Sequence, residues 1–166
     1  MAIPGIDVDP RSLVYKRVVA QYKTDPSIGR RVDWRCWDGA DKDNAPVAND
    51  RPLVVLIPQF DSNERFAVDA WRTTLGIEVR IYLPNDSDAT NYFDLWGAIE
   101  RAIYPKGARD KQLAFEQQLR DAGAETGEIT FPRPAQVVAA DGPGGQPAVL
   151  YATGAMSIAC IRPINS

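Results

Sequence analysis

The fold is decided by the stretch LGIEVRIYL, residues 75–83. Its odd positions, from Leu75 to Leu83, are apolar, and its even positions are Gly, Glu, Arg and Tyr. Because successive side chains of a strand point to opposite faces, this period of two predicts a strand with one buried face. We expect the strand to begin near Phe66. The turn of residues 84–88 ends it and offers capping residues for a helix.

Helices are predicted before and after this strand in the sequence. Asp9 followed by Pro10 is typical of a helix start, with a capping carboxylate and then proline at the first helical position. Pro105 ends a second helix, and Gly123 supplies a left-handed stop for a third, more polar one. Apolar residues recur every three or four positions in each of them. The predicted helices span residues 10–23, 88–104 and 110–122.

Further strands are indicated by β-favouring or alternating segments. The run Leu53–Ile57 is continuously apolar, which predicts a central strand covered on both faces and closed by Pro58. Pro132 and Pro134 are expected to separate two short strands near the C-terminal end. The predicted additional strands span residues 32–37, 53–57, 128–131, 136–140 and 149–161.

This order of elements predicts an α+β fold, in which an N-terminal helix and one or two further helices pack against a mostly antiparallel sheet. The length of 166 residues and the hydrophobic content of 45% fit a single domain over residues 1–166. The longest apolar run is far too short to cross a bilayer, and the first residues lack a secretory pattern, so no membrane partner is expected. A net charge of -3 with interspersed signs predicts no direct reading of nucleic acid.

Histidine is absent from the sequence, which removes the commonest proton shuttle and the commonest transition-metal ligand. We therefore predict that the protein is not an enzyme and needs no cofactor. Paired carboxylates such as Asp86 and Asp88 fall in turns or caps, where Asp bonds backbone amides. Cys36 and Cys160 lie in alternating segments and are predicted to be buried free thiols.

Two loops have part of a binding motif. Residues 38–44 carry the oxygen ligands of a calcium loop but lack its closing glutamate. Residues 142–145 are rich in glycine, but a strand follows them, so a hairpin tip is favoured over a phosphate cradle. A function of a different class stays open, a carboxylate-dependent hydrolase or sugar-binding module, which Glu64, Glu78 and the tryptophans motivate.

Candidate contact residues come from two basic clusters and two tryptophans. The clusters suit an acidic partner surface, and the tryptophans are interpreted as lying opposite the apolar stripe of their strands, as interface anchors do. The candidates are Arg30, Arg31, Arg35, Trp37, Trp71, Lys106, Arg109 and Lys111.

The whole pattern resembles the tail terminator, or tail completion, proteins of long-tailed bacteriophages. The likeness rests on four segments: the N-terminal helix at residues 10–23, the strand at 53–58, the strand at 76–83 with the helix 89–104 that follows it, and the closing strand at 155–161. The resemblance implies a virion subunit of the tail or neck that is assembled in the host cytoplasm.

In that family the subunit typically forms a hexameric ring with copies of itself on the last ring of the tail tube. The resemblance therefore implies contacts with tail tube protein and with the head-side connector or neck proteins. The extra helix at residues 110–122 leaves open a contact with a contractile sheath. Another neck or sheath-associated completion protein is the nearest alternative.

Overall fold

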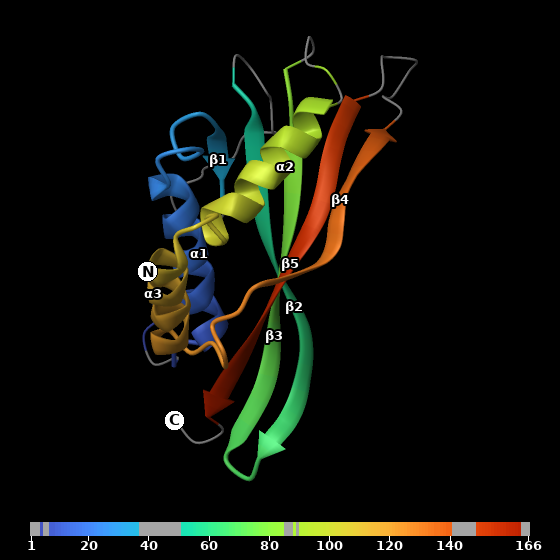
Figure 1. Cartoon of the computed structure of the whole chain (residues 1–166). Helices are drawn as coiled ribbons and strands as arrows, with labels where there is room; N and C mark the ends of the chain where they lie inside the picture. Colours follow the sequence, from blue (N-terminus) through green and yellow to red (C-terminus); the bar gives the residue numbers. More distant parts are fainter. Residues whose placement is uncertain are drawn as a thin grey trace.

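The computed structural model describes residues 4, 7–36, 51–84, 88, 90–140 and 149–163. Within them the chain forms three helices and five strands (Figure 1). In chain order these are α1 (Pro10–Thr24), β1 (Asp33–Arg35), β2 (Leu53–Ala67), β3 (Ala70–Tyr82), α2 (Thr90–Ile103), α3 (Arg109–Asp121), β4 (Thr130–Ala140) and β5 (Val149–Pro163).

The strands form one mixed, mostly antiparallel sheet in the order β1-β2-β3-β5-β4. Only β1 and β2 run parallel, and the other neighbours are antiparallel. All three helices lie on the same side of the sheet (Figure 1). The predicted α+β fold, with an N-terminal helix and two further helices on a mostly antiparallel sheet, is therefore confirmed.

Strands β3 and β5 pair without interruption, from Ala70 opposite Pro163 to Tyr82 opposite Tyr151. Alternate side chains therefore keep to one face throughout. The core residues that point to the helices are Leu75, Ile77, Val79 and Ile81 of β3, and Ala152, Met156, Ile158 and Cys160 of β5. We call the opposite side the open face.

Helix α1 begins as its sequence predicts. The Asp9 carboxylate accepts the backbone N–H of Arg11 at 2.9 Å, and Pro10 occupies the first turn. The buried stripe packs into the core at Val14, Tyr15, Val18, Val19 and Tyr22.

Helix α2 crosses the sheet, and its end is tied to the start of β4. The Tyr104 hydroxyl donates to the Ile129 carbonyl at 2.7 Å and accepts the Ile129 N–H at 2.8 Å. After α3, Gly123 has a φ of 109°, a left-handed conformation that glycine adopts readily. The chain then returns to the sheet through a bridge between Ala124 and Cys160.

Two predicted strand boundaries, at Pro58 and at Phe66, are wrong. Strand β2 does not close at Pro58, which pairs with Ile77 inside the strand. Among the described residues β1 covers β2 only as far as Val55, so no described strand pairs with that side of β2 at Pro58, and a missing N–H is tolerated there. Strand β3 begins at Ala70, because Phe66 belongs to β2.

The segment around the two C-terminal prolines forms one strand instead of two. β4 is continuous, with register shifts between its pairings at Thr130, Arg133 and Gln136. Such irregularities are common at sheet edges, and β4 is the last strand in the described sheet. The loops predicted at residues 38–51 and 141–147, with their calcium-loop and glycine-rich motifs, lie outside the described residues, except for Arg51.

Both cysteines are buried free thiols, as predicted. Cys36 follows β1 beside Leu56, because the Tyr15 hydroxyl lies against the carbonyl oxygens of both residues. Cys160 pairs with Thr73, whereas Leu56 pairs with Val79. Six residues of β3 separate those two positions, roughly 20 Å. This separation excludes a disulfide between the two thiols.

None of the helices in the described part of the chain is both long and apolar enough to span a membrane.

Candidate interaction surfaces

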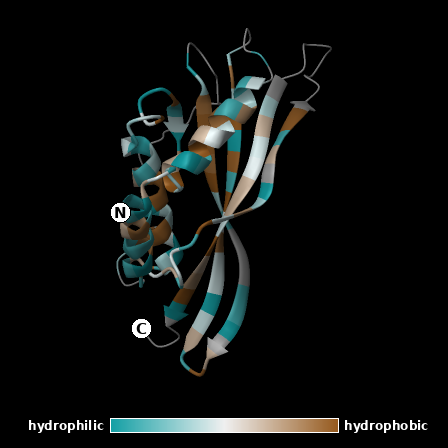
Figure 2. Cartoon of the chain, in the orientation of Figure 1, coloured by the Kyte–Doolittle hydropathy of each residue, from teal (hydrophilic) through white to brown (hydrophobic). Residues whose placement is uncertain are grey.

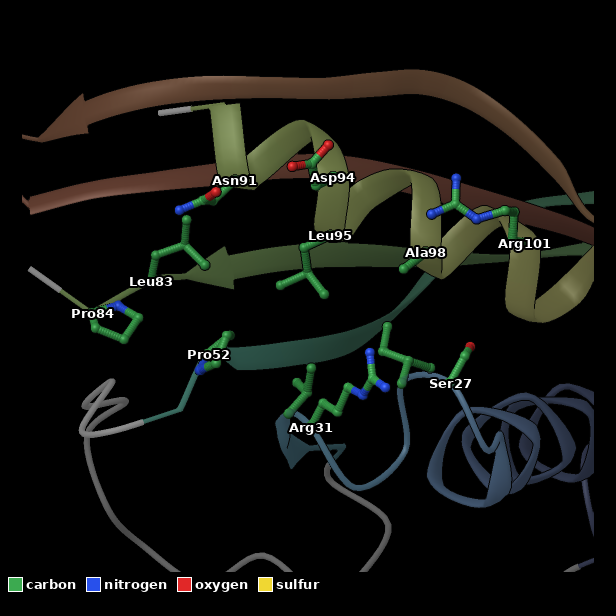
Figure 3. Close-up of a pocket in the computed structure, with 12 residues that line it drawn as sticks. Ser27, Arg31, Pro52, Leu83, Pro84, Asn91, Asp94, Leu95, Ala98 and Arg101 are labelled. Atoms are coloured by element: carbon green, nitrogen blue, oxygen red, sulfur yellow. The ribbon is translucent and has the colours of Figure 1, made fainter. Parts of the chain in front are cut away.

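A groove lies between α2 and the connection from α1 to β1, and we call it the α2 groove (Figure 3). It encloses about 450 Å³. Its apolar lining comes from segments far apart in the sequence, at Ile28, Val32, Leu83, Leu95 and Ala98. Ile28 and Val32 are buried, whereas the other three are half-buried and remain accessible. The groove is therefore an apolar depression at the end of the sheet where β3 finishes.

The charges at the α2 groove are mostly positive. Arg31 stands on the connection from α1 and Arg101 stands on α2, so the two guanidinium groups come from opposite sides of the depression (Figure 3). Both residues are exposed. Asp94 is the acidic residue of the lining. An apolar floor beside two cations suits a partner that presents an apolar side chain next to a carboxylate.

At the opposite end of the sheet, the β2–β3 hairpin projects beyond the helices (Figure 1). Its turn is the two residues Val68 and Asp69, both exposed. Val68 is 84% exposed, the largest value among the exposed large hydrophobic residues in the described part of the chain. The turn is marked as hydrophobic in Figure 2, although much of the hairpin around it is polar. The hairpin therefore presents an apolar tip to solvent, with an acid beside it.

The open face carries polar side chains that are tied to one another. Glu78 accepts from Gln59 Nε2 at 2.7 Å and from Arg80 Nε at 2.5 Å. The carboxylate raises the pKa of the Arg80 guanidinium through this hydrogen bond. Further along, Arg72 is bound through two nitrogens to Glu125, which reaches over β5 from the end of α3. The Gln59–Glu78 hydrogen bond joins β2 to β3, and the Arg72–Glu125 pair joins β3 to the segment after α3, whereas Glu78 and Arg80 lie in the same strand.

The first predicted basic cluster is divided between two environments. Arg30 and Arg31 are exposed in the turn after α1, whereas Arg35 is half-buried in β1. The structure brings Arg31 to the same groove as Arg101, a residue that sequence reasoning did not single out. The helical spacing of α2 gave no signal for this role, because Arg101 is on the exposed side of an amphipathic helix.

The second basic cluster lies together around the start of α3. Lys106, Arg109 and Lys111 are all exposed. Residue Ala108 precedes the helix and provides no side-chain cap. Cations in an uncapped first turn face the positive end of the helix dipole, although Asp110 offsets them. These basic side chains therefore do not contribute to the stability of α3 through its dipole.

The predicted face of Trp71 is wrong, because Trp71 does not lie opposite the apolar stripe of its strand. Trp71 pairs with Arg162 and shares its side of β3 with Thr73 and Leu75, which is the helix side. It is half-buried near the end of β5 instead of standing on the open face. Trp37 lies outside the described residues.

Glu64 and Glu78 do not form a carboxylate pair. Both lie on the open face, where Glu64 is opposite Arg72 and Glu78 is opposite Ile57. Six residues of β3 separate them, roughly 20 Å, whereas the two carboxyls of a glycosidase stand about 5 to 9.5 Å apart. In the part of the chain that the structure describes, no cluster of three or more Asp, Glu or Cys residues could hold a metal ion.

Comparisons with known proteins assign no family to this arrangement. The chain matches no family model, and no curated protein matches it significantly.

Proposed function

We propose that the protein is a structural subunit of the tail or neck of a long-tailed bacteriophage. In this proposal copies of the chain form a ring on the end of the tail tube. The ring ends polymerisation of the tube and joins it to the head-side connector. The subunit is then a virion component, and its partners are copies of itself, tail tube protein and neck proteins.

The observation that carries the proposal is that the segments on which the resemblance rests lie in the expected helices and strands. Residues 10–23 lie in α1, residues 53–58 begin β2, residues 76–82 complete β3, and residues 155–161 lie in β5. The helix expected after the turn is α2. These elements pack around one core, so they behave as parts of a single small α+β subunit.

The surfaces also support a role in assembly. A ring held by head-to-tail contacts needs two different complementary patches on each subunit. The α2 groove and the β2–β3 hairpin are two such non-equivalent surfaces, and they lie at opposite ends of the sheet. The described carboxylates singled out for catalysis lie apart, which gives the hydrolase alternative no support from a paired site.

The proposal is tested by removing the gene from the viral genome that encodes the chain. We expect unjoined heads and tails, with tail lengths spread far beyond the normal single value, when the particles are measured by electron microscopy. Supplying the wild-type chain in trans should restore tails of one length. Normal virions without the chain would refute the proposal, as would a gene that lies away from capsid and tail genes.

A second test uses the purified protein. Light scattering and negative-stain microscopy should show ring-shaped particles, alone or after addition of the tail tube protein encoded by the same genome. A strict monomer under both conditions would contradict the proposed role.

A further inference from the structure

The α2 groove and the hairpin tip lie at opposite ends of one strand. Leu83, which lines the groove, directly follows β3, and Asp69 in the tip directly precedes it. The 13 residues of β3 extend roughly 40 Å between them. A rigid, fully paired strand cannot fold back over that length, so the tip of one chain cannot reach its own groove.

The two surfaces are complementary in chemistry. The tip presents Val68, an exposed apolar side chain, directly beside the carboxylate of Asp69. The groove presents an apolar floor at Leu95 and Ala98, and its charged lining is two arginines and one acid, Asp94, so the lining has a net positive charge. Its volume, about 450 Å³, is within the range of sites that hold a whole small ligand. A two-residue turn is of that size.

Val68 is more exposed than the other large hydrophobic side chains of the described residues, so it is available for burial against a partner. Its burial would be favourable, because it removes apolar surface from water. The two flanking residues, Ala67 and Ala70, are small and do not block the approach of another surface. The tip is therefore shaped to enter a depression.

We propose that the β2–β3 hairpin of one copy of this chain docks into the α2 groove of a second copy. Val68 enters the apolar floor, and Asp69 lies between the guanidinium groups of Arg31 and Arg101. The contact is head-to-tail, so repetition produces a ring if the rotation closes and a filament if it does not. This inference rests on the proposed function, because it supplies the contact between neighbouring subunits of the ring.

Two substitutions break the contact from opposite sides. Val68→Asp places a charge on the tip and leaves the groove intact. Ala98→Glu places a charge in the groove and leaves the tip intact. We expect each variant alone to sediment as a monomer at concentrations at which the wild type forms the ring or filament. Each should keep the wild-type circular dichroism spectrum and melting temperature to within a few degrees, because both positions are accessible to solvent.

Mixing the two variants is the decisive experiment. The intact tip of Ala98→Glu can enter the intact groove of Val68→Asp, but neither remaining surface can continue the chain. Light scattering should therefore show twice the monomer mass and nothing larger. Leu113→Asp is the matched control, because Leu113 is an exposed apolar residue of α3 that lines neither surface. This variant should assemble as the wild type does.

Several outcomes overturn the inference. They are a wild type that stays monomeric at all concentrations both with and without tail tube protein, a Val68→Asp variant that still assembles, or a mixture of the two variants that stays monomeric. If only Ala98→Glu fails to assemble, the groove binds a different segment or a different partner, and the hairpin contact is refuted. The proposed function and the docking contact can fail separately. If wild type and Val68→Asp both restore tail length in the genetic test, the proposed function stands and the docking contact is refuted.

Discussion

Trp96 of α2 lies directly on Gly154 of β5. A β-carbon at Gly154 would stand 2.3 Å from Cη2 of the indole ring, far inside van der Waals contact. The same indole donates from Nε1 to Glu100 at 2.8 Å and meets the Phe131 ring edge-on, with 6.0 Å between the ring centroids. Glycine at this position of β5 therefore sets the distance between α2 and the sheet.

Gly154→Ala should destabilise the fold, because the added methyl group forces Trp96 and α2 away from the sheet. We expect a loss of about 1 to 3 kcal/mol in the free energy of unfolding, measured by urea denaturation. Gly97→Ala is the matched control, since its added carbon meets only the flexible end of Arg101. That control should be neutral or stabilising by up to about 1 kcal/mol, because alanine favours helix. Equal stabilities of the two variants would contradict the packing argument.

Tyr104→Phe should remove both hydrogen bonds that join α2 to the start of β4. The Ile129 N–H and carbonyl would lose their partner in a part-buried position, which costs about 1 to 3 kcal/mol. Tyr151→Phe is the control, because Tyr151 contributes its ring to a stack with Tyr82 at 5.6 Å on the open face. Thermal unfolding should show a lower melting temperature for Tyr104→Phe than for Tyr151→Phe. An unchanged melting temperature for Tyr104→Phe would show that its hydrogen bonds to Ile129 do not stabilise the fold.

The Asp9 carboxylate should make stability depend on pH in the acid range. Its pKa is lowered chiefly by the side-chain hydrogen bond from Arg11, so the folded state holds the proton less tightly than the unfolded chain. The stabilisation is therefore present above the unfolded pKa of about 3.9 and is lost as pH falls through the lower folded value. Asp9→Asn keeps a good helix cap but removes the charge.

We expect Asp9→Asn to be less stable than the wild type at pH 7 by up to about 1 kcal/mol, and the difference to shrink as the pH falls toward 2. Asp9→Ala should lose about 1 kcal/mol more at every pH, because the cap itself is lost. Urea denaturation across the pH range measures both. A difference between wild type and Asp9→Asn that persists undiminished at pH 2 would show that the charge is not the cause.

The Cys160 thiol should be inert in the native protein. Burial raises its pKa to about 12, so at neutral pH it holds roughly a thousandfold less thiolate than a free cysteine. In a Cys36→Ala variant, a thiol-labelling reagent should react with Cys160 only after urea unfolds the chain. Rapid labelling of the folded variant would show that this part of β5 opens readily.

The sequence predicted those elements whose period is visible locally. Residues 75–83 alternate strictly, and the cap at Asp9 and the stop at Gly123 depend only on near neighbours, so these features agree with the structure. Leu53–Leu56 are also buried on both faces as predicted. Local pattern was sufficient because each of these features depends on residues close together in the sequence.

Features that depend on the position of a strand in the sheet were not predictable in the same way. Whether Pro58 can lie inside β2 depends on β1 ending beside Val55, and no local pattern contains that information. The α2 groove draws its lining from segments around residues 28, 83 and 95, which come together only in the folded chain. The error at Trp71 is different in kind, because the sequence itself contained the answer. Trp71 and Leu75 are an even number of positions apart, so they lie on the same face of a strand.

The outer side of β2 is not paired with any described strand from Leu56 onward. An unpaired row of backbone amides at the side of a strand can pair with another chain. Pro58 interrupts that row with a residue that has no hydrogen to give. An approaching strand finds no backbone N–H at that position, so edge-to-edge pairing of β2 with another chain is disfavoured there.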